Sequence, residues 1–224
     1  MFFCEIDGQK VAFDFSDAGL WREDSGIPVF KFHHKANESY RNVFPFSPVS
    51  FFDWDVFYCL RDEIRYNPEG KQKITMRQRP YGNAVDRRTK VAAMLKMEYG
   101  DAVHTDQIRQ IEYWEEISEI RVGVFVPGQN NNMLDRGQFQ YIAFGAATIS
   151  PRLPELLAYS RDLRECYLEC DDAYDNLIAT INVADENALL SVGNRARRLF
   201  EDTSTPEKLT AWIGLCLDEY CGRL

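Results

Sequence analysis

The chain has 224 residues, 45% of them hydrophobic and 13% aromatic, and a formal net charge of −9. This composition is sufficient for a sizeable buried core and excludes a chain that is disordered over long stretches. The first residues lack the basic start, apolar run and cleavage site of a secretory signal, and no apolar run approaches the roughly 18 residues of a membrane helix. We therefore expect a cytoplasmic protein that does not cross a membrane.

The N-terminal third is predicted to begin with a β-hairpin. Residues 2–6 and 10–15 are strand-like runs that flank Asp7 and Gly8, and Asp-Gly supplies the positive φ angles of a tight type I′ turn. A third strand is expected at 28–33. Residues 34–48 are polar and then interrupted by proline, so they are predicted to form a loop.

The middle of the chain alternates between helix and strand signals. Apolar residues at spacings of three and four predict a helix from Ser47 to Tyr66, and a strand is expected over 71–79. Good helix formers predict a helix at 86–99, which Gly100 ends. A further helix is expected at 105–118.

Two more strands are predicted before the character of the sequence changes. They cover 119–126 and 138–149 and could pair as a hairpin with a long polar loop. After Pro151 the signals are almost entirely helical. Three helical segments are expected, at about 154–180, at 184–201, and from 204 or 205 to 220.

The predicted fold class is therefore α+β. Residues 1–150 are expected to form an α+β domain, in which antiparallel hairpins pack with helices. Residues 151–224 are expected to form a C-terminal three-helix region, which either stands apart or packs on the first domain as one unit.

The clearest functional signal is a basic segment in an acidic chain. Between Arg61 and Lys96 ten basic and four acidic residues give a net charge of +6, which leaves −15 for the rest. Alternate basic residues of the strand predicted at 71–79 would share one face, with tyrosine nearby. Such a face can hold a phosphate backbone or an acidic protein surface, and it can also be a solvated outer face. The candidate binding residues are Lys71, Lys73, Arg77, Arg79, Tyr81, Arg87, Arg88 and Lys90.

The six cysteines are interpreted as free thiols. Cys166 and Cys170 are four positions apart, and Cys216 and Cys221 are five apart, so two pairs could in principle form a zinc site. Structural zinc sites, however, usually place such pairs on tight turns, whereas these lie in predicted helices. Packed thiols are the preferred interpretation, and no metal site is predicted.

An acidic cluster is the other metal candidate. Asp171, Asp172 and Asp175 could hold cations in the manner of metal-dependent nucleases, but the usual neighbouring lysine and strand-borne carboxylates are missing. A solvated helix face is the preferred interpretation. The sequence also contains neither a phosphate-cradling glycine loop nor a nucleophile elbow, so no catalytic residue and no cofactor is predicted.

These observations favour a non-enzymatic acidic binding protein, such as an inhibitor, an immunity-type protein or an adaptor, which acts through charged surfaces on a protein partner. The first alternative is a nucleic-acid-binding subunit that uses the basic residues between 71 and 96. The second is a metal-dependent enzyme. A homodimer formed through the C-terminal helices is also compatible with the sequence.

Overall fold

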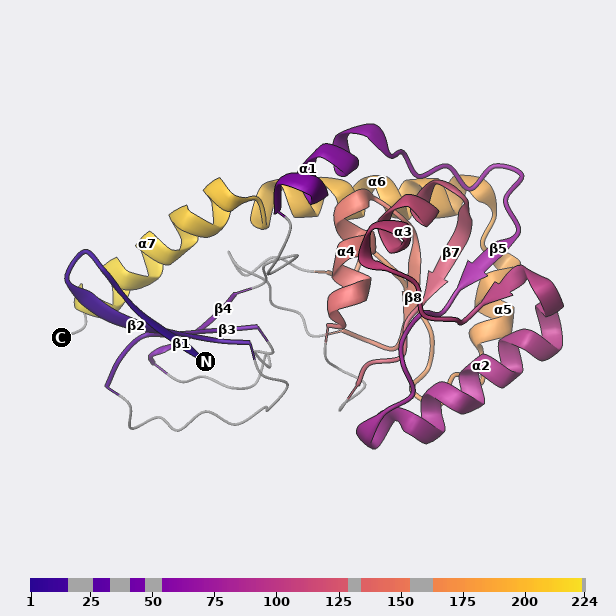
Figure 1. The fold of residues 1–224 in the computed structure, drawn as a ribbon, viewed down its shortest axis with the longest axis horizontal. Coiled ribbons are helices and arrows are strands. Elements are labelled where there is room, and N and C mark those ends of the chain that lie inside the picture. Colours follow the sequence, from indigo (N-terminus) through magenta and orange to yellow (C-terminus); the bar gives the residue numbers. More distant parts are fainter. Residues whose placement is uncertain (16–25, 33–40, 47–53, 129–133, 154–162, 223–224) are drawn as a thin grey trace. The chain divides into compact units, whose positions relative to one another are not determined.

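A computed structural model describes residues 1–15, 26–32, 41–46, 54–128, 134–153 and 163–222. The chain forms two compact units (Figure 1), which we treat separately. The mixed-sheet unit consists of Met1–Pro48, Pro154–Asp162 and Glu201–Leu224, and the parallel-sheet unit consists of Val49–Leu153 and Leu163–Phe200. Each unit thus draws on segments from both sides of residue 150.

The mixed-sheet unit contains a four-stranded sheet in the order β1-β2-β3-β4. The first two strands are antiparallel, and the other neighbours are parallel. The predicted hairpin is confirmed, because Asp7 and Gly8 have φ angles of 49° and 80° and connect the two antiparallel strands. The strands are β1 (Phe2–Ile6), β2 (Gln9–Asp14), β3 (Val29–Lys31) and β4 (Val43–Pro45).

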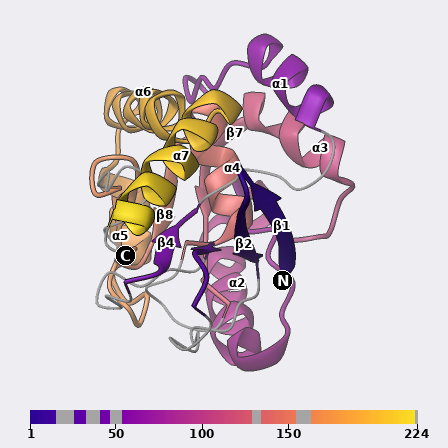
Figure 2. The same ribbon diagram turned by 90° about the vertical axis from the view of Figure 1, so that its left-hand side faces the viewer.

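Helix α7 (Pro206–Gly222) covers this sheet, as both views show (Figures 1 and 2). The Trp212 indole donates a hydrogen bond to the Pro45 carbonyl at 2.7 Å, and the Tyr220 hydroxyl donates one to the Gly26 carbonyl at 2.8 Å. Leu209, Cys216 and Leu217 are buried against aromatic and aliphatic residues of the strands. The predicted C-terminal helix is therefore confirmed, and its apolar stripe packs on the sheet.

The parallel-sheet unit contains five strands in the order β6-β5-β7-β8-β9, all parallel. The chain leaves β5 toward β6 on one side and then returns to place β7 on the other side. This reversal makes the gap between β5 and β7 the topological switch point of the sheet. The strands are β5 (Lys73–Thr75), β6 (Val103–His104), β7 (Ile120–Val124), β8 (Thr148–Ser150) and β9 (Leu168–Glu169).

Helices connect and surround these strands (Figure 1), and close packing requires a glycine within one strand. A Cβ atom at Gly123 of β7 would lie 2.9 Å from ring atoms of both Phe125 and Tyr141, so only glycine lets these rings pack there. The helices are α1 (Trp54–Glu63), α2 (Val85–Tyr99), α3 (Gln110–Glu115), α4 (Arg136–Phe144), α5 (Leu177–Val183) and α6 (Glu186–Thr203), with short 3-10 turns at Gly82–Ala84, Gly100–Ala102 and Glu116–Ser118.

The α+β class is confirmed by the mixed sheet and by the C-terminal helices α5, α6 and α7. The hairpin predicted between 119–126 and 138–149 is wrong. Most of 138–149 is helix α4, β8 follows it, and β7 and β8 are parallel. Every residue from Gln138 to Phe144 is buried, and a helix buried on all sides does not show the periodicity that separates it from a strand.

Other differences are smaller. The helix predicted over 105–118 is confined to α3 and the turn after it. Strand β6 lies where the flank of a helix was expected, and β4 lies where a loop was expected. The long helix predicted at 154–180 contains β9 and α5, and its beginning lies outside the described residues. The first residues of the helix predicted from Ser47 also lie outside them. Among the described helices, none has the length and apolar character needed to cross a membrane.

Candidate functional site

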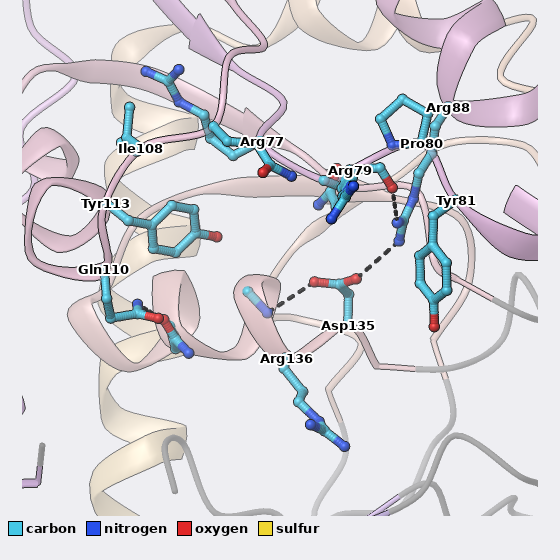
Figure 3. Close-up of a pocket in the computed structure, with 14 residues that line it drawn as sticks. Arg77, Arg79, Pro80, Tyr81, Arg88, Ile108, Gln110, Tyr113, Asp135 and Arg136 are labelled. Carbon is cyan, nitrogen blue, oxygen red and sulfur yellow. Dashed lines mark hydrogen bonds and ion pairs between the residues drawn. The ribbon is translucent and has the colours of Figure 1, made fainter. Parts of the chain in front are cut away.

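A cavity of about 860 Å³ opens at the carboxyl ends of β5, β6 and β7 (Figure 3). Its walls come from the segments that follow these three strands and from the first turns of α3 and α4. It therefore lies at the switch point of the parallel sheet. The lining residues that carry the argument are Arg77, Arg79, Tyr81, Arg88, Tyr113, Asp135, Arg136, Gly137 and Gln140.

Arg77 fixes the segment after β5. Its guanidinium donates hydrogen bonds to both carboxylate oxygens of Glu116, at 3.1 and 2.7 Å, and to the Asp106 carbonyl at 2.7 Å. Burial acts to lower the Arg77 pKa, but the hydrogen bonds and charge of Glu116 raise it above its usual value. Arg77 therefore joins the loops after β5 and β6 and has little capacity left for a ligand.

Glu116 is the centre of a buried network beneath this wall. The residue is 5% exposed and accepts a hydrogen bond from the Tyr141 hydroxyl at 2.9 Å, in addition to those of Arg77. The Lys73 ammonium lies 3.5 Å from the same carboxylate and 3.0 Å from the exposed Glu119. Two cations and a hydroxyl thus share one buried carboxylate, which satisfies its lone pairs.

Arg88 of α2 is a second clamp. It donates hydrogen bonds to the backbone carbonyls of Arg79 at 2.6 Å and Val126 at 3.0 Å, and its Nη2 lies 3.4 Å from Oδ2 of Asp135. Burial lowers the Arg88 pKa, while Asp135 opposes this effect. Because an arginine stays charged far above neutral pH, the side chain holds the β5–α2 and β7–α4 connections together as a cation.

Asp135 begins helix α4. Its Oδ1 accepts hydrogen bonds from the backbone N–H groups of Gly137 at 2.8 Å and Gln138 at 3.4 Å, as an N-cap does. The only carboxylate that lines the cavity in the described structure is thus occupied by the helix and by Arg88. Asp135 thereby fixes the first turn of α4, which includes the lining residues Arg136 and Gly137 (Figure 3).

Arg79 and Tyr81 form the exposed side of the cavity. Arg79 is exposed, and within the described residues its guanidinium makes no hydrogen bond or ion pair, although Arg88 fixes its backbone carbonyl. Tyr81 is 60% exposed. Four arginines and one aspartate line the cavity, so it carries a positive surplus within an acidic chain.

The opposite wall is neutral (Figure 3). It comprises the Tyr113 ring, Ile108 and the amides of Gln110 and Gln140. Burial, together with the negative charges nearby, raises the Tyr113 pKa well above its usual value, so this hydroxyl stays protonated at neutral pH.

The structure brings together four of the eight residues predicted from the sequence: Arg77, Arg79, Tyr81 and Arg88 line the cavity. The other four do not. Lys73 binds Glu116 and Glu119, Arg87 donates to the Pro127 carbonyl, Lys90 contacts Ala173 and Asp175, and Lys71 lies in the turn before β5. Since β5 has only three residues, the alternating basic face does not extend to Arg77 and Arg79.

The sequence did not indicate Asp135, Arg136, Gly137 or Gln140. Asp135, Arg136 and Gly137 precede the strand predicted at 138–149, and Gln140 lies in it, so the start of α4 was not expected there. The sequence signal that could have revealed them is an aspartate, Asp135, in the N-cap position before a helix that a glycine, Gly145, ends. Gly145 has a φ angle of 81°, as such a helix end requires.

The former metal candidates have structural partners. The Asp171 carboxylate accepts backbone hydrogen bonds from Ala173, Asp175 and Asn176, which lower its pKa and shape the turn before α5. Cys166, Cys170 and Cys216 are buried and form no disulfide in the described structure. Among the described residues, no three His, Cys, Asp or Glu side chains are grouped closely enough to hold a metal ion.

No protein-family model and no curated protein sequence matches this chain. The site is therefore interpreted from its own geometry.

Proposed function

We propose that the cavity at the switch point binds a phosphate-bearing small molecule. The observation that carries this proposal is the excess of arginine over carboxylate in this cavity, four to one, in a chain whose net charge is −9. A concave site with one sign of charge concentrates ligands of the opposite sign. Arginine also matches the geometry of phosphate oxygens better than any other side chain.

The position and size of the cavity support the same function. In open parallel sheets, ligands bind outside the carboxyl ends of the strands at the switch point. The volume of about 860 Å³ lies within the range of roughly 300–1,000 Å³ that small-molecule pockets occupy. The earlier expectation of a macromolecular partner shares four residues with this cavity, Arg77, Arg79, Tyr81 and Arg88, and it stays a prediction.

Within this site Arg77, Arg88 and Arg79 have different tasks. Arg77 and Arg88 are bound to Glu116, Asp135 and backbone carbonyls, so they build the walls. Arg79 has a guanidinium that is exposed and unused by the described residues. We therefore assign the principal ligand contact to Arg79.

The test is titration calorimetry with pyrophosphate as the probe, comparing the wild-type chain with Arg79→Ala. Loss of a charge-assisted hydrogen bond costs about 1.5–3 kcal/mol, so we expect binding to weaken by about 10- to 100-fold. The matched control is Lys90→Ala, which removes the same charge from α2 at a residue that does not line the cavity.

Equal losses in the two variants would mean that only net charge matters, and the pocket would then be the wrong site. A wild-type chain that does not bind pyrophosphate at low salt would also refute the proposal. Pyrophosphate binding should weaken as the salt concentration rises, because salt screens the charge of the exposed Arg79.

A further inference from the structure

The neutral wall of the cavity holds two hydrogen-bonding groups in fixed positions. Gln140 is only 9% exposed, and its Oε1 accepts hydrogen bonds from Trp114 Nε1 and Gln110 Nε2, both at 2.8 Å. An indole nitrogen can only donate, so the oxygen of the amide must face Trp114. The Gln140 Nε2 group then has no acceptor among the described residues, although the residue lines the cavity.

Tyr113 presents the second group. Its ring packs against Tyr141, with 4.9 Å between ring centroids, and Figure 3 shows its hydroxyl directed into the cavity. A Cβ atom at Gly137 would lie 2.6 Å from this hydroxyl oxygen, so the glycine leaves the space in which the hydroxyl lies. No described residue forms a hydrogen bond with the Tyr113 hydroxyl, and its raised pKa keeps it neutral.

We propose that Tyr113 and Gln140 form a subsite for the hydroxyl groups of a phosphorylated sugar, bound either as a free sugar phosphate or as the ribose phosphate of a nucleotide. This inference rests on the proposed function, because the arginine side of the same cavity takes the phosphate.

The chemistry of the two walls favours this ligand over other anions. A second phosphate would be bound more strongly by arginine than by a neutral phenol and an amide, so this wall is not suited to it. A purely apolar group would leave the buried Gln140 donor unsatisfied, at a cost in binding free energy. A sugar hydroxyl both accepts and donates, so it can pair with the Gln140 amide and with the Tyr113 hydroxyl.

The experiment compares phosphate monoesters that carry an ethyl group, a sugar, or a sugar with a base. Calorimetry measures the affinity of the full chain for ethyl phosphate, ribose 5-phosphate and adenosine 5′-monophosphate. We expect at least one of the two sugar-bearing ligands to bind about tenfold more tightly than ethyl phosphate. Which of the two binds more tightly distinguishes a sugar phosphate from a nucleotide.

Tyr113→Phe is the decisive variant. It keeps the ring that packs on Tyr141 and removes a hydroxyl that no described residue uses, so we expect the variant to fold as the wild type does. It should lower the preference for the sugar-bearing ligand about fivefold and leave ethyl phosphate binding unchanged. Gln140→Glu provides a second variant, because it keeps an oxygen for Trp114 but removes the amide donor.

The outcomes separate this inference from the proposed function. If ethyl phosphate binds as tightly as the sugar-bearing ligands, or if Tyr113→Phe does not change the preference, the hydroxyl subsite is refuted while phosphate binding stands. If the wild type binds none of the three ligands, the proposed function itself fails.

Discussion

The two units use buried charge in different ways. In the mixed-sheet unit Lys31 on β3 and Asp14 on β2 form an ion pair of 2.7 Å, and their side chains are 0% and 5% exposed. Both charges of this pair are buried in the sheet. In the parallel-sheet unit Glu116 binds two cations, and the cavity above it contains four arginines and one carboxylate.

This difference indicates where an external ligand is expected. A buried ion pair stabilises the fold only while both partners are present, and its paired charges are not available to a ligand. In the cavity, Arg79 is exposed and makes no ion pair with a described residue, so its positive charge is available to an anion. The contrast therefore assigns a structural task to the ion pair of the mixed-sheet unit and a binding task to the parallel-sheet unit.

The largest expected effect comes from breaking the pair in the mixed-sheet unit. Asp14→Ala leaves the Lys31 ammonium buried without its carboxylate, and we expect the free energy of unfolding to fall by about 3–5 kcal/mol. Urea denaturation followed by circular dichroism measures this loss.

The double variant Asp14→Ala with Lys31→Met is its control, because it removes the buried charge as well as the partner. It should recover most of the stability. A loss in Asp14→Ala below about 1 kcal/mol would contradict the structural task of the pair.

A smaller loss is expected from the network under the cavity. Glu116→Ala removes the common partner of Arg77 and Lys73. Because these two cations are only partly buried, we expect the free energy of unfolding to fall by about 2–3 kcal/mol. The same denaturation experiment measures it. The matched control is Glu119→Ala, since Glu119 is 64% exposed and its pair with Lys73 should contribute little. Similar losses in the two variants would show that Glu116 is not the centre of the network.

The smallest expected effect concerns alkaline pH and the thiols of the two units. Burial, reinforced by Asp171, raises the pKa of Cys170 to about 12, whereas an unfolded thiol titrates at about 8.5. The raised pKa stabilises the fold below the unfolded pKa, and this contribution is lost as pH rises toward the folded value. Between about pH 8 and pH 10, the free energy of unfolding of the wild type should fall by about 1–2 kcal/mol more than that of Cys170→Ala.

Urea denaturation at the two pH values measures that difference. Cys4→Ala is the control variant in the mixed-sheet unit, because it removes an exposed thiol. If Cys170→Ala keeps the full alkaline loss, the Cys170 thiol does not contribute to it.

Local signals predicted the elements that depend on a few neighbouring residues. Asp7 and Gly8 specified the first turn, Gly100 ended α2 with a φ angle of 56°, and the apolar stripe of 206–220 produced α7. Three cavity arginines, Arg77, Arg79 and Arg88, were also found, because their charge stands out in an acidic chain, and Tyr81 was found as an aromatic residue near them. Lys71, Lys73, Arg87 and Lys90 have the same charge, but they do not line the cavity.

The sequence by itself determined the α+β class, the first hairpin and a basic segment, and half of the eight site residues predicted in that segment line the cavity. Only the tertiary structure decided that the strands of the second sheet are parallel, because that arrangement depends on helices that return each strand to the same edge. It also brought Asp135, Gly137 and Gln140 to the arginines that follow β5. These residues are about sixty positions apart in the chain, and no periodicity encodes a contact between strand ends that meet only when the sheet forms.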